Sequence, residues 1–267
     1  MKKVITSTQN SYIKELVQLK EKSRTRKKNQ TFLVEGLREI ILALKGGYII
    51  ENLLIDTSIL KEELLVDILT NNDIEIIEIS SDVYKKLALR DTTEGVIAVV
   101  KFKNLSIKEL QLTTKNPLIL VAEAPEKPGN IGALLRTADA AGIDAVLIAN
   151  PKTDMYNPNI IRSSVGCIFT INIATGTTEE IIDFLKQKNI NMYGAALTAS
   201  VEYQTIDYTQ PSAIVVGTED TGLTNEWLKN TTKNIIIPMR GAIDSMNVSV
   251  SAAIILFEGV RQRQLIK

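Results

Sequence analysis

Apolar and polar positions alternate in two rhythms along the chain, and these rhythms predict helices and strands in turn. Apolar residues three and four apart favour amphipathic helices, whereas short runs of Ile, Leu and Val favour strands. In the first hundred residues the pattern predicts helices over 10–22, 37–44, 59–71 and 82–89, and strands over 32–36, 49–56, 74–79 and 96–102. This alternation predicts a compact α/β domain.

The second half of the chain carries more continuous apolar runs. Strands are predicted over 118–122, 145–149, 168–173, 191–196, 213–216 and 235–237, and helices over 131–141, 159–164, 178–188 and 248–262. Fully apolar strands separated by helices indicate a mostly parallel sheet covered by helices on both faces. The less hydrophobic stretch 104–115 is a predicted linker, so the predicted domains are 1–103 and 116–267.

The composition excludes several kinds of site. The 267 residues include no histidine and one cysteine, Cys167, so we expect no His-based triad, no metal site and no internal disulfide. The formal net charge is zero, and any nucleic-acid site therefore has to be a local basic patch. No apolar stretch reaches the roughly 18 residues of a membrane span, and the amino terminus lacks a signal core. We expect a soluble, cytoplasmic protein.

One basic patch lies near the amino terminus. Its cationic residues are Lys20, Lys22, Arg24, Arg26, Lys27 and Lys28. The run fits a solvated helix end and a surface that contacts nucleic-acid phosphates about equally well.

Polar residues follow the first strand of the second half. Asn130 stands at the predicted N-cap of helix 131–141, and Arg136 lies on its second turn, on the same face as Gly132. Arg136 has two interpretations. Its guanidinium can present a fork to a phosphate, or it can pair on the surface with Asp139 or Glu126.

Two later strand-to-helix connections have the same character. Gly217 allows a ligand to approach the backbone closely, and Glu219 can orient a ligand hydroxyl, although both residues also fit an ordinary turn. Ser245 and Asn247 stand where the last helix is predicted to begin. There they suit either an N-cap or a polar ligand site.

Together the three connections resemble the motifs of the SpoU (TrmH) family, which are RNA 2′-O-ribose methyltransferases that use S-adenosylmethionine. The matching stretches are N-x-G-A-x-x-R-T-A from Asn130, V-x-G-x-E-x-x-G-L from Val215, and I-P-M-x-G-x-x-x-S-M-N-V-S-V from Ile237. Met246 stands where leucine is commoner. The stretch F-L-V-E-G-L-R from Phe32 resembles the ribosomal-protein-like substrate-binding domain that is fused to the rRNA branch of the family.

The resemblance implies a fold, partners and a set of site residues. The fold is an α/β sheet with a deep trefoil knot, although knots are rare. The expected partners are RNA, with large-subunit rRNA favoured over tRNA, and a second copy of the chain. The residues implied to contact S-adenosylmethionine are Gly217, Ile237, Met239, Met246, Leu197 and Thr198; those implied in catalysis are Arg136, Asn130, Glu219, Ser245 and Asn247. The basic patch and Arg38 are the expected RNA contacts.

No histidine is available to accept the proton of a ribose hydroxyl. The resemblance favours Arg136 as the base, but a guanidinium with a pKa above about 12 is a poor one. We therefore expect Arg136 to clamp the phosphate beside the target ribose, with that phosphate or Glu219 accepting the proton. Asn130, Ser245 and Asn247 are then expected to orient Arg136 and the ribose.

Two other functions compete with this interpretation. A Rossmann-type enzyme needs a glycine-rich turn after its first strand, and residues 123–129 do not provide one. A non-catalytic RNA-binding protein on the same fold is the second alternative. The tyrosine-bearing stretches 155–158 and 203–208 can stack on bases, but we expect them to pack within loops. Cys167 is expected to be buried.

Overall fold

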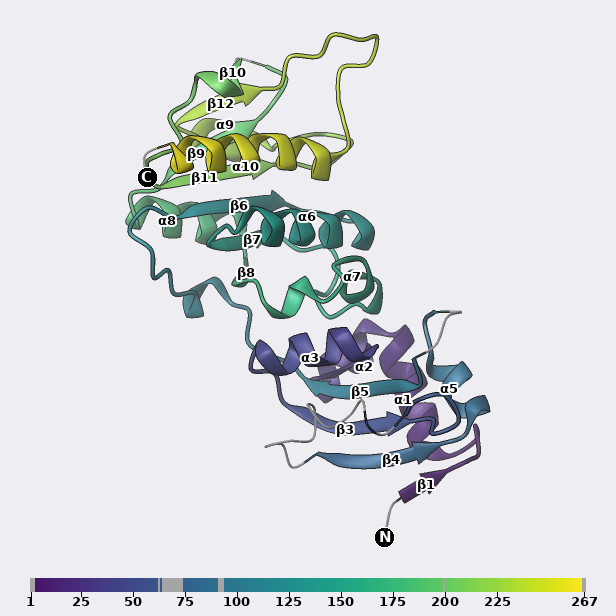
Figure 1. Cartoon of the computed structure of the whole chain (residues 1–267). Coiled ribbons are helices and arrows are strands. Elements are labelled where there is room, and N and C mark those ends of the chain that lie inside the picture. Colours follow the sequence, from purple (N-terminus) through teal and green to yellow (C-terminus); the bar gives the residue numbers. More distant parts are fainter. Residues whose placement is uncertain (1–2, 62, 64–73, 91–93, 199, 266–267) are drawn as a thin grey trace. The chain divides into compact units, whose positions relative to one another are not determined.

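The computed structural model describes residues 3–61, 63, 74–90, 94–198 and 200–265. The chain divides into two compact units (Figure 1). The first unit contains Met1–Lys103 and Asp154–Thr170, and the second contains Asn104–Thr153 and Ile171–Lys267. The predicted helix over 59–71 lies largely outside the described residues.

The first unit is built on a five-stranded sheet in the order β1-β4-β3-β5-β2. Strands β1, β4 and β3 are parallel, and β5 runs antiparallel to both β3 and β2. The strands are β1 (Lys3–Ile5), β2 (Thr31–Glu35), β3 (Ile50–Ile55), β4 (Glu75–Ile79) and β5 (Val96–Lys101); the helices are α1 (Ser11–Glu21), α2 (Ser23–Asn29), α3 (Leu37–Lys45) and α5 (Ser81–Leu87). Helix α1 buries Ile13, Leu16 and Leu19, which recur every three residues on one face of the predicted helix.

A segment from the second half of the sequence packs into the first unit. This strap, Asp154–Thr170, carries α7 (Pro158–Ser163) and a 3₁₀ turn, Cys167–Phe169. The Tyr156 ring stacks on Phe32 with 4.3 Å between centroids, and Phe169 packs against Tyr48 at 5.1 Å. The single domain boundary predicted near residue 104 is therefore incomplete, because the chain returns to the first unit for the strap and then leaves it again. Nothing in the sequence indicated this, because aromatic packing between distant segments has no sequence periodicity.

The second unit is built on a seven-stranded sheet in the order β10-β12-β9-β11-β6-β7-β8. All its neighbouring strands are parallel. The strands are β6 (Leu118–Glu123), β7 (Ala145–Ala149), β8 (Ile173–Gly176), β9 (Asn191–Ala195), β10 (Ser200–Glu202), β11 (Ser212–Val216) and β12 (Lys233–Ile236); the helices are α6 (Pro128–Ala141), α8 (Thr178–Gln187), α9 (Asn225–Asn230) and α10 (Val248–Gln264). The predicted α/β fold with a parallel sheet is confirmed, and β6, β7 and β11 are buried throughout.

The last helix returns to the middle of this sheet. Helix α10 packs along α6 and against β11 and β6, although β12, the strand before it, lies two strands away from β11 (Figure 1). Gly259 of α10 faces Leu118, to which an added Cβ would come within 3.3 Å. The trefoil knot that the resemblance implies stays a prediction.

Some local predictions were wrong. The predicted strand 168–173 is instead the 3₁₀ turn of the strap, and β8 begins only at Ile173. Val165 and Gly166 have φ values of 58° and 85°, so the chain turns sharply just before Ile168 and Phe169, which are buried by packing on the first unit. The predicted linker 104–115 packs into the second unit, where Ile107 joins the core and Ser106 bridges Thr175.

Candidate functional site

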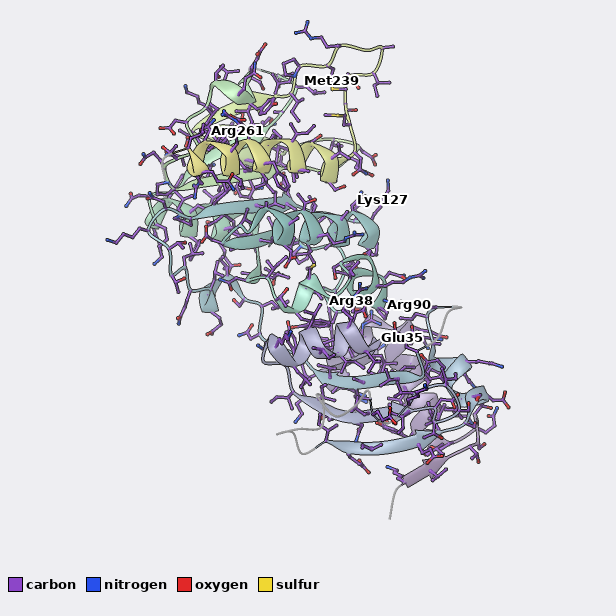
Figure 2. The ribbon with its side chains drawn as sticks, in the orientation of Figure 1. Glu35, Arg38, Arg90, Lys127, Met239 and Arg261 are labelled. Atoms are coloured by element: carbon purple, nitrogen blue, oxygen red, sulfur yellow. The ribbon has the colours of Figure 1, made fainter. Side chains whose placement is uncertain are left out.

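Three loops of the second unit meet at one edge of its sheet. They follow β6, β11 and β12, and parallel strands place their carboxyl ends on the same edge, where open α/β sheets bind ligands. We call them the first loop (124–127), the second loop (217–224) and the third loop (237–247). Figure 2 shows Lys127 at the start of α6 and Met239 on the third loop.

The first loop ends in a helix that begins earlier than predicted. Pro128 is the first residue of α6 and Lys127 is its N-cap, so Asn130 lies inside the first turn and is not the N-cap. Proline suits this position because the missing N–H has no intrahelical partner there. The Asn130 side chain does not cap the helix, and its amide donates instead to Glu219 Oε1 at 2.7 Å.

Glu219 of the second loop joins all three loops. Its Oε1 accepts hydrogen bonds from Asn130 Nδ2 and, at 2.9 Å, from Asn247 Nδ2. Its Oε2 accepts a hydrogen bond from Lys127 Nζ. Asn247 Nδ2 also lies 3.2 Å from Asn130 Oδ1. We call Lys127, Asn130, Glu219 and Asn247 the polar cluster.

The hydrogen bonds of the cluster stabilise the ionised form of Glu219. The bond from Lys127, followed by the bond from Asn130, lowers the pKa of the Glu219 carboxyl. The hydrogen bond to Glu219, together with the negative charge of that carboxylate, raises the pKa of Lys127. Glu219 is therefore a weak proton acceptor and a firm anchor for its neighbours. Lys127 was not among the site residues predicted from the sequence, although it lies three residues before Asn130 and the second loop carries a carboxylate.

Asn247 has both of the roles considered for it. It is the N-cap of α10, where its Oδ1 accepts hydrogen bonds from Ser249 N at 3.0 Å and Ser249 Oγ at 2.6 Å. Its amide nitrogen remains available for Glu219. Ser245 lies outside the polar cluster, because its hydroxyl donates to Asp244 Oδ1 at 3.2 Å.

Arg136 is exposed on α6, one turn beyond Gly132, which is buried. Among the described residues, no hydrogen bond joins its guanidinium to the polar cluster, and no ion pair forms with Asp139 or Glu126. The side-chain amides of Asn130 and Asn247 are bonded to Glu219 and not to Arg136, so their expected role in orienting Arg136 and the ribose stays a prediction.

A cavity of about 510 Å³ adjoins the polar cluster. It lies between the second loop, the third loop and the residues that follow β9. All six residues expected to contact the cofactor line it, namely Gly217, Ile237, Met239, Met246, Leu197 and Thr198. Ser245 and Glu219 line it as well.

The lining fits a ligand of nucleoside type. The volume lies in the range of small-molecule sites, and the walls combine aliphatic and thioether side chains with backbone groups. Asp220 and Asp244 add carboxylates that suit a ligand carrying positive charge. Gly217 is required by the backbone, because an added Cβ would lie 2.1 Å from the carbonyl carbon of Gly222.

The expected RNA contacts of the first unit separate into two groups. Lys22, Arg24, Lys27 and Lys28 are exposed, as is Arg38, whereas Lys20 donates to the Lys86 carbonyl at 2.7 Å. Arg26 was wrongly placed among them. It is 2% exposed, donates to Leu19 O at 2.7 Å and pairs with Asp154 of the strap at 2.6 Å.

The remaining candidates are structural. Tyr156 and Tyr208 are buried, and the Tyr208 hydroxyl donates to the Tyr203 carbonyl at 2.9 Å. Cys167 is half-buried, so the expectation that it is fully buried was wrong. Within the described ranges, no group of three or more His, Cys, Asp or Glu residues is placed to hold a metal ion. None of the helices described is long and apolar enough to cross a membrane.

Comparison with known proteins agrees with this geometry. Residues 117–257 match the model of the SpoU rRNA Methylase family, and residues 10–98 match the MRM3-like substrate binding domain. The 23S rRNA (guanosine(2553)-2′-O)-methyltransferase of Bacillus subtilis is 31% identical over 96% of this chain and 98% of its own length.

Two solved structures resemble the chain over nearly its whole length. One, an RNA 2′-O ribose methyltransferase, has a TM-score of 0.84 and 39% identity, covering 98% of this chain and 99% of the other. The second, the SpoU methyltransferase AviRb from Streptomyces viridochromogenes in complex with AdoMet, has a TM-score of 0.87 and 28% identity over 96% of this chain and 99% of its own.

Proposed function

Because the chain belongs to the SpoU rRNA methylase family, we propose that it transfers a methyl group from S-adenosylmethionine to a ribose 2′-hydroxyl of large-subunit rRNA. The observation that carries this proposal is the polar cluster beside the cavity. It brings side chains from three loops to one side of a nucleoside-sized space.

The cavity is the proposed cofactor site. Leu197, Ile237 and Met239 provide apolar walls for the adenosine, and Met246 with the Gly217 backbone closes the space. When bound, S-adenosylmethionine supplies a methyl group that is activated by its positively charged sulfur. The work left for the protein is to position the ribose hydroxyl and to help remove its proton.

The polar cluster is proposed to hold the ribose and not to accept its proton. Both oxygens of Glu219 already accept hydrogen bonds from Lys127, Asn130 and Asn247, so they are proposed to anchor the cluster. Arg136 is exposed and free of the cluster, so it is proposed to bind the phosphate beside the target ribose. That phosphate is then the proposed proton acceptor, and Ser245 the contact to the ribose at the rim of the cavity.

The first unit is proposed to select rRNA, in the cytoplasm. The relative from Bacillus subtilis acts on 23S rRNA and aligns with both units of this chain. The match of residues 10–98 to a substrate-binding domain supports the same assignment. The exposed cations Lys22, Arg24 and Lys28 are proposed to contact RNA phosphates, which position a substrate more than they specify it.

We propose that the chain acts as a homodimer. Val250 and Phe257, two turns apart on α10, are each 47% exposed, with Ile254 half-buried between them. This apolar stripe is suited to a second copy. Light scattering should give the mass of a dimer for the native chain and that of a monomer for Phe257→Lys. A monomeric native chain would contradict the assignment.

The proposed activity is tested with methyl-labelled S-adenosylmethionine and unmodified total RNA, fractionated afterwards into rRNA and tRNA. We expect label in large-subunit rRNA, at one position where alkali no longer cleaves the chain because the 2′-oxygen is blocked. Arg136→Ala is the inactive control.

Other outcomes separate the alternatives. Label in tRNA would keep the reaction and reject the rRNA assignment. Cofactor binding without label in any RNA, including RNA from ribosome assembly intermediates, would favour a non-catalytic RNA-binding protein. If the RNA is hydrolysed to bases and sugars and the label is found on a base, the 2′-hydroxyl is rejected as the acceptor.

A further inference from the structure

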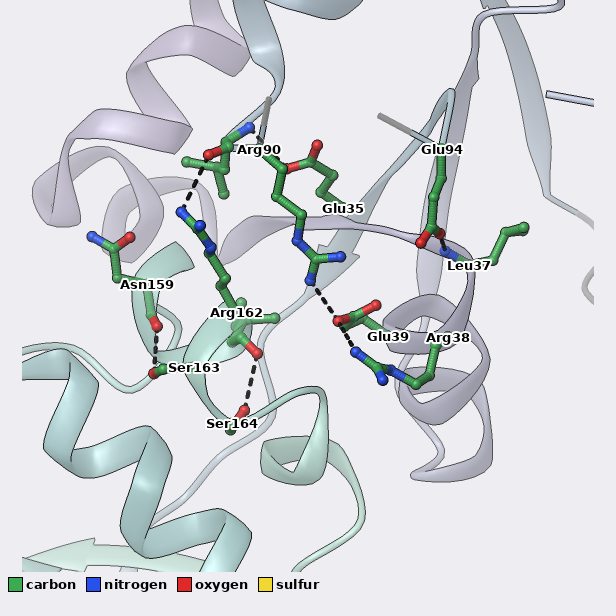
Figure 3. Close-up of polar contacts among 12 residues, drawn as sticks. Glu35, Leu37, Arg38, Glu39, Arg90, Glu94, Asn159, Arg162, Ser163 and Ser164 are labelled. Atoms are coloured by element: carbon green, nitrogen blue, oxygen red, sulfur yellow. Dashed lines mark hydrogen bonds and ion pairs between the residues drawn. The ribbon is translucent and has the colours of Figure 1, made fainter. Parts of the chain in front are cut away.

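Two arginines bind a buried carboxylate in the first unit, and a third is bonded to the backbone next to one of them. The carboxylate is Glu39 on the first turn of α3, and it is 1% exposed. Its Oε1 accepts hydrogen bonds from Arg90 Nη2 at 2.6 Å and from Arg38 Nη2 at 3.0 Å (Figure 3). Arg162, on α7 of the strap, donates to the carbonyl of Leu89, the residue before Arg90, at 3.4 Å.

The buried carboxylate acts as an anchor for two guanidinium groups. Burial disfavours the charged form of Glu39, but the hydrogen bonds from Arg90 and Arg38 outweigh it, so its pKa is lowered. Two cations share one carboxylate oxygen, so Glu39 does not fully neutralise either guanidinium. A buried ion pair contributes little net stability. The consequence of this one is that Glu39 fixes the positions of the two guanidinium groups.

The backbone is shaped to admit this anchor. Gly36, between β2 and α3, has φ of 105°, and an added Cβ would lie 2.6 Å from Glu39 Oε2. Gly166 of the strap has φ of 85°, and its added Cβ would lie 3.4 Å from Glu39 Cα. Two glycines from distant segments therefore let the chain close over Glu39.

The three arginines differ in how far their side chains are exposed. The side chain of Arg38 is 60% exposed and that of Arg90 is 20% exposed, and Arg162 is exposed. A guanidinium has five N–H donors. Each of these three makes one side-chain hydrogen bond among the described residues, so most of their donors remain available.

The other acids near the arginines are occupied by the backbone. Glu35 is buried, and its oxygens accept hydrogen bonds from Leu89 N at 2.8 Å and Tyr84 Oη at 3.4 Å. Burial raises the pKa of the Glu35 carboxyl, and the backbone hydrogen bond from Leu89 opposes that shift. Glu94 accepts from the Leu37 N–H at 2.7 Å. The groups left to meet a ligand are mainly arginine N–H donors.

We propose that Arg38, Arg90 and Arg162 form a binding site for backbone phosphates of the RNA substrate, and that Glu39 is its positioning residue. Planar guanidinium forks match phosphate oxygens, and these three come from α3, the segment that follows α5, and the strap. The inference rests on the proposed RNA substrate. It also gives the strap a role, since Arg162 comes from the sequence of the methyltransferase half.

The experiment measures the affinity of the full chain for an unmodified large-subunit rRNA transcript over a series of salt concentrations. Arg38→Ala and Arg162→Ala remove exposed side chains, and Lys229→Ala on α9 is a control that removes the same charge elsewhere. Each arginine variant should weaken binding about fivefold near 0.15 M salt and reduce the slope of log Kd against log salt by about one. The control should change neither quantity.

Glu39→Gln separates positioning from charge. This variant makes the unit more positive, so RNA binding tightens if only net charge matters. If Glu39 positions the guanidinium groups, RNA binding weakens in spite of the added charge. Circular dichroism and thermal unfolding show whether the variant folds, and Arg162→Ala keeps the test decisive if it does not.

The outcomes distinguish this site from the proposed activity. S-adenosylmethionine binding, measured by calorimetry, should be unchanged in all variants, because the cavity lies in the other unit. Methyl transfer by the native chain, together with arginine variants that bind RNA as the control does, would overturn the phosphate site alone. RNA binding that depends on the arginines without any methyl transfer would overturn the activity alone.

Discussion

Asn247 and Glu219 are joined by a hydrogen bond of 2.9 Å across 28 residues of sequence. The bond fixes the N-cap of α10 to the second loop, and a further bond from Asn130 to the same carboxylate oxygen adds the start of α6. The edge of the sheet is thus held by one carboxylate, and the cavity beside it keeps its shape through that anchor.

Removing the charge of this carboxylate should slow methyl transfer. Glu219→Gln keeps the volume but loses charge-assisted hydrogen bonds, each worth about 1.5–3 kcal/mol, so we expect a loss of about tenfold to a hundredfold in turnover. Single-turnover methyl transfer measures it, with Glu226→Gln on α9 as a matched control. If Glu219→Gln turns over as fast as Glu226→Gln, the charge of the Glu219 carboxylate is not needed for methyl transfer.

Replacing Lys127 should move the titration of Glu219. In the native chain, hydrogen bonds from Lys127 and Asn130 hold the pKa of Glu219 below its ordinary value of 4.5. A lowered carboxyl pKa contributes stability that is present above the ordinary value and is lost as the pH falls through the folded-state pKa. In Lys127→Ala, the carboxyl resonance of Glu219 should titrate at higher pH. An unchanged midpoint by nuclear magnetic resonance would reject the pair as the cause.

A substitution at Arg136 tests the phosphate clamp. Lysine keeps the charge but loses the planar fork, so Arg136→Lys should lower turnover by about a hundredfold, the size of effect seen when a positioned donor is removed. Affinity for S-adenosylmethionine should stay within a factor of about two, because Arg136 does not line the cavity. Arg261→Lys on α10 is the control. Near-normal turnover of Arg136→Lys would reject both roles considered for Arg136, binding of the phosphate and acceptance of the proton.

Arg26 and Arg24, two residues apart on α2, should respond in opposite ways. Arg26→Ala leaves Asp154 buried without its partner and should cost about 3–5 kcal/mol in the free energy of unfolding. Arg24→Ala removes an exposed side chain and should weaken RNA binding at low salt with little effect on unfolding. Denaturant unfolding and RNA titration of both variants measure the difference. Equal destabilisation by the two variants would contradict the buried pair.

Local sequence patterns were sufficient to predict the alternation of helices and strands, the parallel sheet and the three loops that meet at one edge of it. These features follow from local periodicity and from residues such as Gly217 and Asn247, whose roles depend on backbone next to them in the chain. The six expected cofactor contacts came instead from the resemblance of these loops to the family motifs, and all six line the cavity.

Whether a charged side chain is exposed or buried in an ion pair depends on contacts that form only in the folded chain. Arg24 and Arg26 are equivalent in a basic run, yet one is exposed and the other is buried against Asp154, 128 residues later. Glu39 and Arg90 lie 51 residues apart in the sequence and meet only in the folded first unit. The strap packs into the first unit through aromatic contacts, and no spacing of residues in the sequence predicts these contacts. Contacts between distant segments depend on three-dimensional packing, and a pattern of neighbouring residues does not contain them.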